Sequence, residues 1–148
     1  LKQMAANAYD ALRTSFPDSV RYTENYEKLL VRLDSLDTAC AEALRQADVH
    51  TIVIYHPALT YYAADYGLEQ LAVEHDGKEP SARHLARLIE EARRKKVRRV
   101  FYQAQYPAST VKVIAEDIGA RSVKIDPLRE DVIENIGEIT RQLTSGNE

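Results

Sequence analysis

The chain has 148 residues, of which 45% are hydrophobic and 29% charged, as expected for a globular protein that buries a core. Its 20 basic and 23 acidic side chains give a net charge of −3, so no positive excess favours a nucleic-acid partner. Cys40 is the single cysteine, which excludes an internal disulfide and a cluster of thiolate metal ligands.

The chain opens directly on a helical pattern that stops at Phe16-Pro17, and we expect it to be a piece of a longer protein. A longer helix follows, with Asp18 or Ser19 as its N-cap. Its apolar residues recur at spacings of three and four over about 28 residues, which corresponds to roughly 42 Å of helix. Such a helix is either a coiled-coil partner or a strut that runs to another domain. The apolar stripe consists of Tyr22, Tyr26, Leu29, Leu33, Leu36, Cys40, Ala43 and Ala47.

The rest of the chain alternates between short β-branched runs and helical patterns. Helices between successive strands indicate βαβ units and a parallel sheet. Gly67 and Gly119 stand where helices commonly end, and Ser81 stands where one begins. We predict an α/β fold, a three-layer lobe with a four-stranded parallel sheet of order 2-1-3-4, flanked by helices and preceded by the long helix. The expected strands are residues 51–55, 70–73, 99–102 and 122–125, and the expected helices are residues 58–66, 81–95, 107–118 and 128–143.

His56 directly follows the first expected strand, in the run TIVIYHP. In open parallel sheets, ligands bind beyond the carboxyl ends of the strands, and imidazole is the commonest protein metal ligand. His56 is therefore a candidate metal ligand. The alternative is a packed or hydrogen-bonded histidine that binds no ligand.

Polar side chains also end two other expected strands. Asp126 ends the last strand, where it suits a carboxylate ligand and equally an N-cap that precedes Pro127 at the first helical position. Gln103 and Gln105 follow the third strand, where uncharged amides suit the outer coordination sphere of a ligand or the wall of a cleft. The alternative for both glutamines is a polar loop.

Other chemistries lack their sequence motifs. The glycines form no dinucleotide or phosphate loop, no serine stands in a G-x-S-x-G elbow, and H-E-x-x-H is absent. One histidine and one aspartate cannot complete the four-ligand shell that zinc usually takes, so further ligands must come from elsewhere. The loop at residues 74–80 also offers ligands, but its glycine and proline favour a surface turn with at most weak metal contact.

Several segments occur together in a specific order. They are HPA at 56–58, YAADYGLEQ at 62–70, GKEPS at 77–81, VFYQAQY at 100–106 and IDPL at 125–128. This combination resembles the carboxyl-terminal lobe of the metal-binding substrate-binding proteins of bacterial zinc and manganese ABC importers. Upstream, YTENY at 22–26 and the leucine-rich stripe resemble the long helix that joins the two lobes in that family. The resemblance covers essentially the whole chain.

The resemblance implies a non-enzymatic receptor, periplasmic or lipid-anchored outside the cytoplasm and related to adhesin-like lipoproteins. Such a receptor captures a metal between its two lobes and delivers it to the ABC transporter permease in the membrane. His56 matches a histidine ligand of the family and Asp126 matches its carboxylate ligand, while two histidines would come from the missing amino-terminal lobe. A histidine at position 56 favours Zn²⁺ as the transported ligand, with Mn²⁺ or Fe²⁺ as alternatives.

On this interpretation residues 1–17 end a preceding helix or linker, residues 18–48 form the interlobe helix, and residues 49–148 form the metal-binding lobe. Tyr22 and Tyr26 would leave apolar surface at the start of the long helix, so we expect self-association of the isolated chain. Two other functions stay open. One is a flavodoxin-like enzyme domain that acts on a small polar ligand, and the other is a helical interaction module that uses the apolar stripe.

Overall fold

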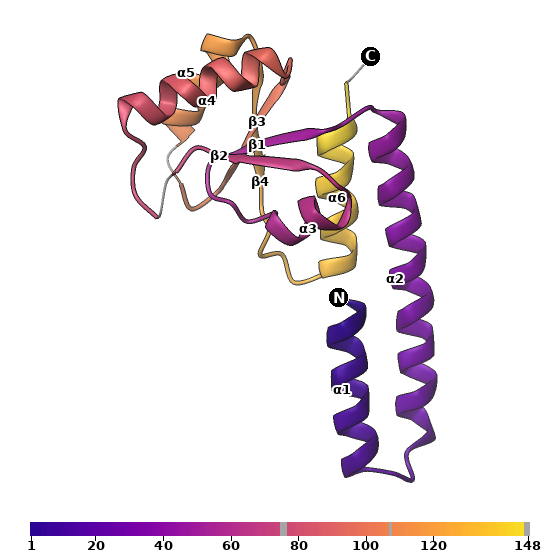
Figure 1. The fold of residues 1–148 in the computed structure, drawn as a ribbon. Coiled ribbons are helices and arrows are strands. Elements are labelled where there is room, and N and C mark those ends of the chain that lie inside the picture. Colours follow the sequence, from indigo (N-terminus) through magenta and orange to yellow (C-terminus); the bar gives the residue numbers. More distant parts are fainter. Residues whose placement is uncertain (75–76, 107, 147–148) are drawn as a thin grey trace. The chain divides into compact units, whose positions relative to one another are not determined.

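The computed structural model describes residues 1–74, 77–106 and 108–146 (Figure 1). The chain divides into two compact units, Leu1–Glu42 and Ala43–Glu148. No described helix combines the length and the apolar character that a membrane span requires.

The first unit contains α1 (Lys2–Ser15) and most of α2 (Val20–Gln46), which confirms both predicted helices. The ring of Tyr9 in α1 stacks on Tyr26 in α2, with centroids 4.3 Å apart and planes 3° from parallel. The Tyr9 hydroxyl also lies 2.9 Å from the hydroxyl of Thr23. Stacking and hydrogen bonding therefore hold the start of α2 against α1 within this unit.

The start of α2 keeps part of the apolar surface that the sequence predicts there. Tyr22 and Tyr26 are half-buried rather than fully exposed. Phe16 and Val20 beside them keep 55% and 70% of their surface exposed. Self-association of the isolated chain stays a prediction, and sedimentation at rising protein concentration would measure it.

The second unit contains the predicted parallel sheet, with the strand order β2-β1-β3-β4. Each strand begins and ends within one residue of its predicted bounds. The elements are β1 (Thr51–Ile54), α3 (Thr60–Asp65), β2 (Glu69–Ala72), α4 (Ala82–Arg94), β3 (Arg99–Gln103), α5 (Ala108–Ile118), β4 (Arg121–Ile125) and α6 (Val132–Thr144).

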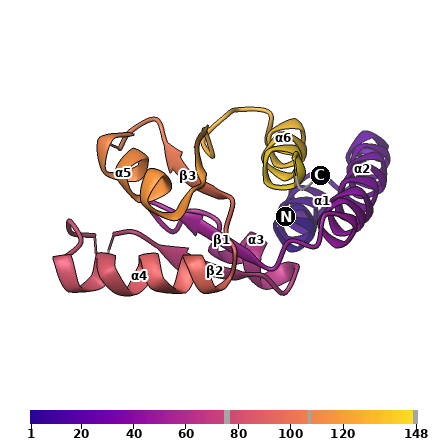
Figure 2. The same cartoon turned by 90° about the horizontal axis from the view of Figure 1, so that it is seen from above.

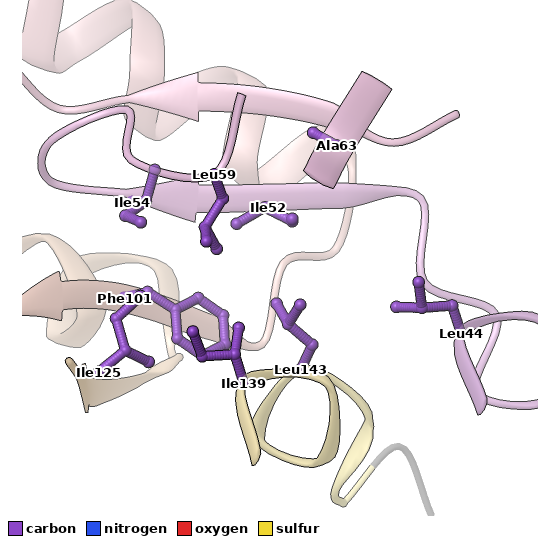
Figure 3. Packing of buried hydrophobic residues seen from close by; sticks show 9 residues of the cluster. All are labelled: Leu44, Ile52, Ile54, Leu59, Ala63, Phe101, Ile125, Ile139 and Leu143. Carbon is purple, nitrogen blue, oxygen red and sulfur yellow. The ribbon is translucent and has the colours of Figure 1, made fainter. Parts of the chain in front are cut away.

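Two apolar cores lie on the two faces of the sheet, because successive strand residues point to opposite faces. Figure 2 shows α4 and α5 on one side of the strands and α6 on the other. The core under α3 and α6 (Figure 3) consists of Leu44, Ile52, Ile54, Leu59, Ala63, Phe101, Ile125, Ile139 and Leu143. The core under α4 and α5 consists of Val53, Tyr55, Val73, Leu88, Ala92, Val100, Val111, Ile114 and Ala115.

The predicted helix ends are confirmed at Ser81, Gly67 and Gly119, and Gly119 directly follows α5 with a φ of +69°. The Ser81 hydroxyl accepts the backbone N–H of His84 at 3.2 Å and so caps α4. Gly67 adopts a φ of +65° just after α3, a conformation that favours glycine. The turn at Gly67 leads directly from α3 into β2, which pairs in parallel with β1.

The predicted N-cap of the last helix is wrong. Asp126 was expected to cap a helix at 128–143, but α6 begins at Val132 and its N-cap is Asp131. The Asp131 carboxylate accepts the backbone N–H of Glu134 at 3.0 Å. The reason lies in the sequence D-V-I-E at 131–134, which places an acidic residue at the third helical position and matches a capping box. Asp126 instead closes a tight turn.

The core under α6 should control the stability of the second unit. Phe101 is 3% exposed, and Phe101→Ala should lower the free energy of unfolding by about 3–5 kcal/mol, since it leaves a cavity between the sheet and α6. Tyr61, which is 89% exposed, is the matched aromatic control, and Tyr61→Ala should change stability by about 0.5 kcal/mol or less. Urea denaturation measures both values. Equal effects of the two substitutions would contradict the described packing.

Candidate metal site

His56 lies two residues beyond the end of β1, at the carboxyl edge of the sheet, and its backbone is held by Gln103. The Gln103 amide nitrogen donates to the His56 carbonyl at 2.7 Å. The His56 N–H donates to the Gln103 amide oxygen at 3.4 Å. Gln103 ends β3 and is 2% exposed, so its side chain has little freedom to move. Both ends of one buried amide therefore fix the position of His56.

The imidazole of His56 is oriented by Glu74, which lies two residues beyond the end of β2. The His56 Nδ1 lies 2.7 Å from the Glu74 Oε1. The Glu74 side chain is 9% exposed and the His56 side chain 42% exposed. Because a carboxylate only accepts hydrogen bonds, the pair favours the tautomer with the hydrogen on Nδ1, which in neutral imidazole leaves the Nε2 lone pair for a ligand. Such carboxylate–histidine pairs are typical of metal-binding histidines.

The ring of Tyr106 covers one face of the imidazole. The ring of Tyr106 stacks on His56 with centroids 5.3 Å apart and packs on Tyr55 at 5.0 Å. Burial, and then the charges of Glu79 and Glu74, raise the pKa of the Tyr55 hydroxyl. The phenol therefore stays neutral at neutral pH and acts as packing surface rather than as an anionic ligand.

Asp126 directly follows β4 at the same edge of the sheet. In the strand register Ile54 pairs with Phe101, so His56, two residues further, lies beside Gln103. Gln103 in turn pairs with Ile125 of β4, and Asp126 is the next residue. Since β3 separates β1 from β4, their backbones are two strand spacings apart, or about 10 Å. The end of β3, with the Gln103 amide, lies between them.

The carboxylate of Asp126 is part of a local turn. Its Oδ1 accepts the backbone N–H of Leu128 at 3.1 Å. Its backbone carbonyl accepts a hydrogen bond of 2.9 Å from the side chain of Asn135, which is 5% exposed. A buried residue of α6 thus fixes the backbone of Asp126, while the exposed carboxylate has a second oxygen for another partner.

The predicted residues and the described contacts agree only in part. Gln103 binds His56 directly, whereas Gln105 is exposed. His75 and Asp76, from the loop with possible weak metal contact, lie outside the described residues. Across residues 1–74, 77–106 and 108–146, no three His, Cys, Asp or Glu side chains are grouped so that they could hold a metal ion.

Glu74 is the partner that sequence reasoning missed, because the whole loop at 74–80 was interpreted as a surface turn. The signal was present in the predicted topology. Glu74 directly follows the predicted strand at residues 70–73, and the corresponding β2 is the parallel neighbour of β1. The rule that singled out His56 and Asp126 at strand ends applies equally to Glu74.

The sequence from residue 1 to residue 145 matches the family model described as zinc-uptake complex component A, periplasmic (ZnuA). The chain belongs to this family. It is 31% identical over 122 residues to the zinc-binding lipoprotein AdcA of Streptococcus pneumoniae, covering 80% of this chain and 24% of that protein. It is 27% identical over 115 residues to the high-affinity zinc uptake system protein ZnuA of Bacillus subtilis, covering 76% and 36% of the two chains.

Solved structures share this fold. A crystal structure of ZnuA is similar with a TM-score of 0.91 and 29% identity, over 99% of this chain and 58% of that chain. The laminin-binding protein Lbp of Streptococcus pyogenes has the same fold at a TM-score of 0.82 and 22% identity, over 96% and 61% of the two chains.

These comparisons confirm the resemblance to metal-binding substrate-binding proteins. The family is a component of zinc uptake and not an enzyme, as the sequence predicted. The chain spans about a quarter of AdcA and 58% of the solved ZnuA chain.

Proposed function

We propose that this chain is the carboxyl-terminal lobe, with the interlobe helix, of an extracytoplasmic receptor that captures Zn²⁺ between two lobes and delivers it to an ABC transporter permease. The observation that carries the proposal is the His56 imidazole, whose Nδ1 is held by Glu74 so that Nε2 is offered to a ligand. The description of the family as a periplasmic component of zinc uptake supports both the cargo and the compartment.

Zinc is the favoured cargo because the proposed site begins with an imidazole nitrogen. A site richer in oxygen ligands would suit Mn²⁺ better, and Mn²⁺ and Fe²⁺ are the alternatives. In the proposal Asp126 supplies a carboxylate oxygen from the end of β4, and Gln103 steadies His56 from the strand between them. Zinc usually takes four protein or water ligands, so the remaining positions belong to the other lobe.

The orientation of His56 gives a direct test by nitrogen NMR of the two-lobed receptor labelled at histidine. Zinc should shift the Nε2 resonance of His56. The hydrogen should stay on Nδ1, which donates it to Glu74. His50, which lies before β1 and is exposed, is the matched control and should not respond. Binding through Nδ1, or an unchanged His56 at zinc saturation, would contradict the proposed site.

The carboxylate of Glu74 should tune zinc affinity although it does not contact the metal. Replacing Glu74 by Gln or Ala should weaken zinc binding about 10- to 100-fold, because the imidazole loses the charged partner that orients it and raises its basicity. Glu79→Gln removes an exposed carboxylate from the same loop and should leave the affinity unchanged. Competition with a fluorescent zinc chelator measures all three variants. Equal affinities of the Glu74 and Glu79 variants would show that the pair has no role in binding.

A further inference from the structure

A cavity of about 340 Å³ lies at the amino edge of the sheet, opposite the edge that carries His56. Its walls are the junction between α2 and β1, the turn between α4 and β3, and the last turn of α6. Leu143 and Phe101 form its apolar side. The candidate metal site and this cavity share no side chain, so the role of one does not depend on the other.

The lining carries more positive than negative charge. Four cations, Lys95, Lys96, Arg98 and Arg99, face one carboxylate, that of Asp48. The Lys95 ammonium is paired with Glu69, which lies outside the lining. For Lys96, Arg98 and Arg99, the described part of the chain provides no carboxylate within salt-bridge distance.

Among Lys96, Arg98 and Arg99, the half-buried side chain is that of Arg99. Its Nη1 donates to the carbonyls of Gln142 and Leu143 at 3.2 and 2.7 Å, at the end of α6. Arg99 is also level with Arg121 on the neighbouring strand. Burial, followed by repulsion from Arg121 and Arg98, lowers the pKa of the Arg99 guanidinium. An anion beside Arg99 would relieve that repulsion.

The simplest alternative is that these cations only complement helix ends. The carboxyl ends of α2, α4 and α6 border the cavity, and each carries about half a negative charge, or roughly −1.5 in total. The lining has four positive charges, of which Glu69 neutralises that of Lys95 and Asp48 offsets one more. A charge of +2 therefore remains in the lining. The helix ends therefore leave part of the positive charge without a counterpart.

We propose that this cavity binds an oxyanion of the phosphate type through Lys96, Arg98 and the guanidinium of Arg99. Guanidinium groups bind phosphate oxygens through paired, charge-assisted hydrogen bonds, and lysine adds a mobile point charge. The volume admits a phosphate with bound water or the phosphoryl group of a larger molecule, because a cavity of this size falls in the range of small-ligand sites. The same chemistry is offered by free phosphate and by a phospholipid headgroup.

The experiment titrates the chain with inorganic phosphate at constant ionic strength and follows the arginine Nε–H resonances. A saturable shift at Arg99 is expected. A double variant with Lys96→Asn and Arg98→Gln should bind phosphate at least about tenfold more weakly, since it loses two charged donors. Asparagine at 96 tolerates the φ of +53° found there. Lys112→Gln, an exposed charge removed from α5, is the matched control and should bind as the parent does.

A second arm distinguishes the two sources of phosphate. The chain is sedimented with vesicles of phosphatidylglycerol and, for comparison, of phosphatidylcholine. Variant-sensitive phosphate binding without vesicle binding assigns a free anion, and variant-sensitive binding to phosphatidylglycerol vesicles assigns a headgroup. Absence of both, or equal binding by the parent and the double variant, overturns the proposal. In that case the cations only complement the partial negative charges at the carboxyl ends of the helices.

Discussion

Zinc should bind to the isolated 148-residue chain at least about a thousandfold more weakly than to the two-lobed receptor. Two ligands, His56 and Asp126, are expected from this chain, and water would fill the other positions of an open site. Full zinc sites are worth about 10–16 kcal/mol, so losing half the ligands removes several kcal/mol even after water replaces them. Competition with a chelator of known affinity measures the difference between the two proteins.

The control for this comparison is the His56→Ala variant of the isolated chain, which should abolish the residual binding at that site. Tight binding by the unaltered isolated chain would mean that a complete site lies within these 148 residues. The loop that contains His75 and Asp76 would then be the next place to substitute. Such a result would contradict the proposal that the cargo is shared between two lobes.

The architecture of the second unit was predictable because its strands and helices differ in period. Ile52 and Ile54 enter one core and Val53 the other, so an unbroken β-branched run indicates a strand buried on both faces. Short connections and right-handed crossovers then limit the strand orders, and the predicted order is the one found.

The start of the last helix was not predicted correctly because two aspartates compete for its cap. Asp126-Pro127 matches a cap followed by a first helical residue, but it is Asp131 that accepts the N–H of Glu134 in the first turn of α6. The Asp126 carboxylate meanwhile binds the nearby N–H of Leu128. The pairing of Asp126 with Pro127 therefore gives no measure of which of the two aspartates begins the helix.

The contacts around His56 show what strand-end reasoning can and cannot give. It predicts which residues share an edge of the sheet, and His56 and Gln103 do meet there. The stacking of Tyr106 on His56 depends on how the loop after β3 folds back over β1. Such a loop path has no period in the sequence, so this contact could be found only in the structure.

In the proposed two-lobed receptor, His56→Ala should weaken zinc binding at least about 100-fold, since the proposed site would lose one of about four ligands and full zinc sites are worth about 10–16 kcal/mol. The substitution also removes the hydrogen-bond partner of Glu74, whose side chain is 9% exposed. An unpaired buried carboxylate lowers stability by roughly 1–3 kcal/mol or more. Affinity and stability must therefore be separated.

His56→Gln separates them, because its amide can donate to Glu74 while it offers no imidazole nitrogen to the metal. His50→Ala is the control for loss of a histidine at the opposite edge of the sheet. If His56 is a ligand, the Ala and Gln variants lose zinc affinity alike, although only the Ala variant loses stability in metal-free denaturation. If the Gln variant keeps the parent's affinity, then His56 acts only by holding Glu74, and the metal is bound by other residues.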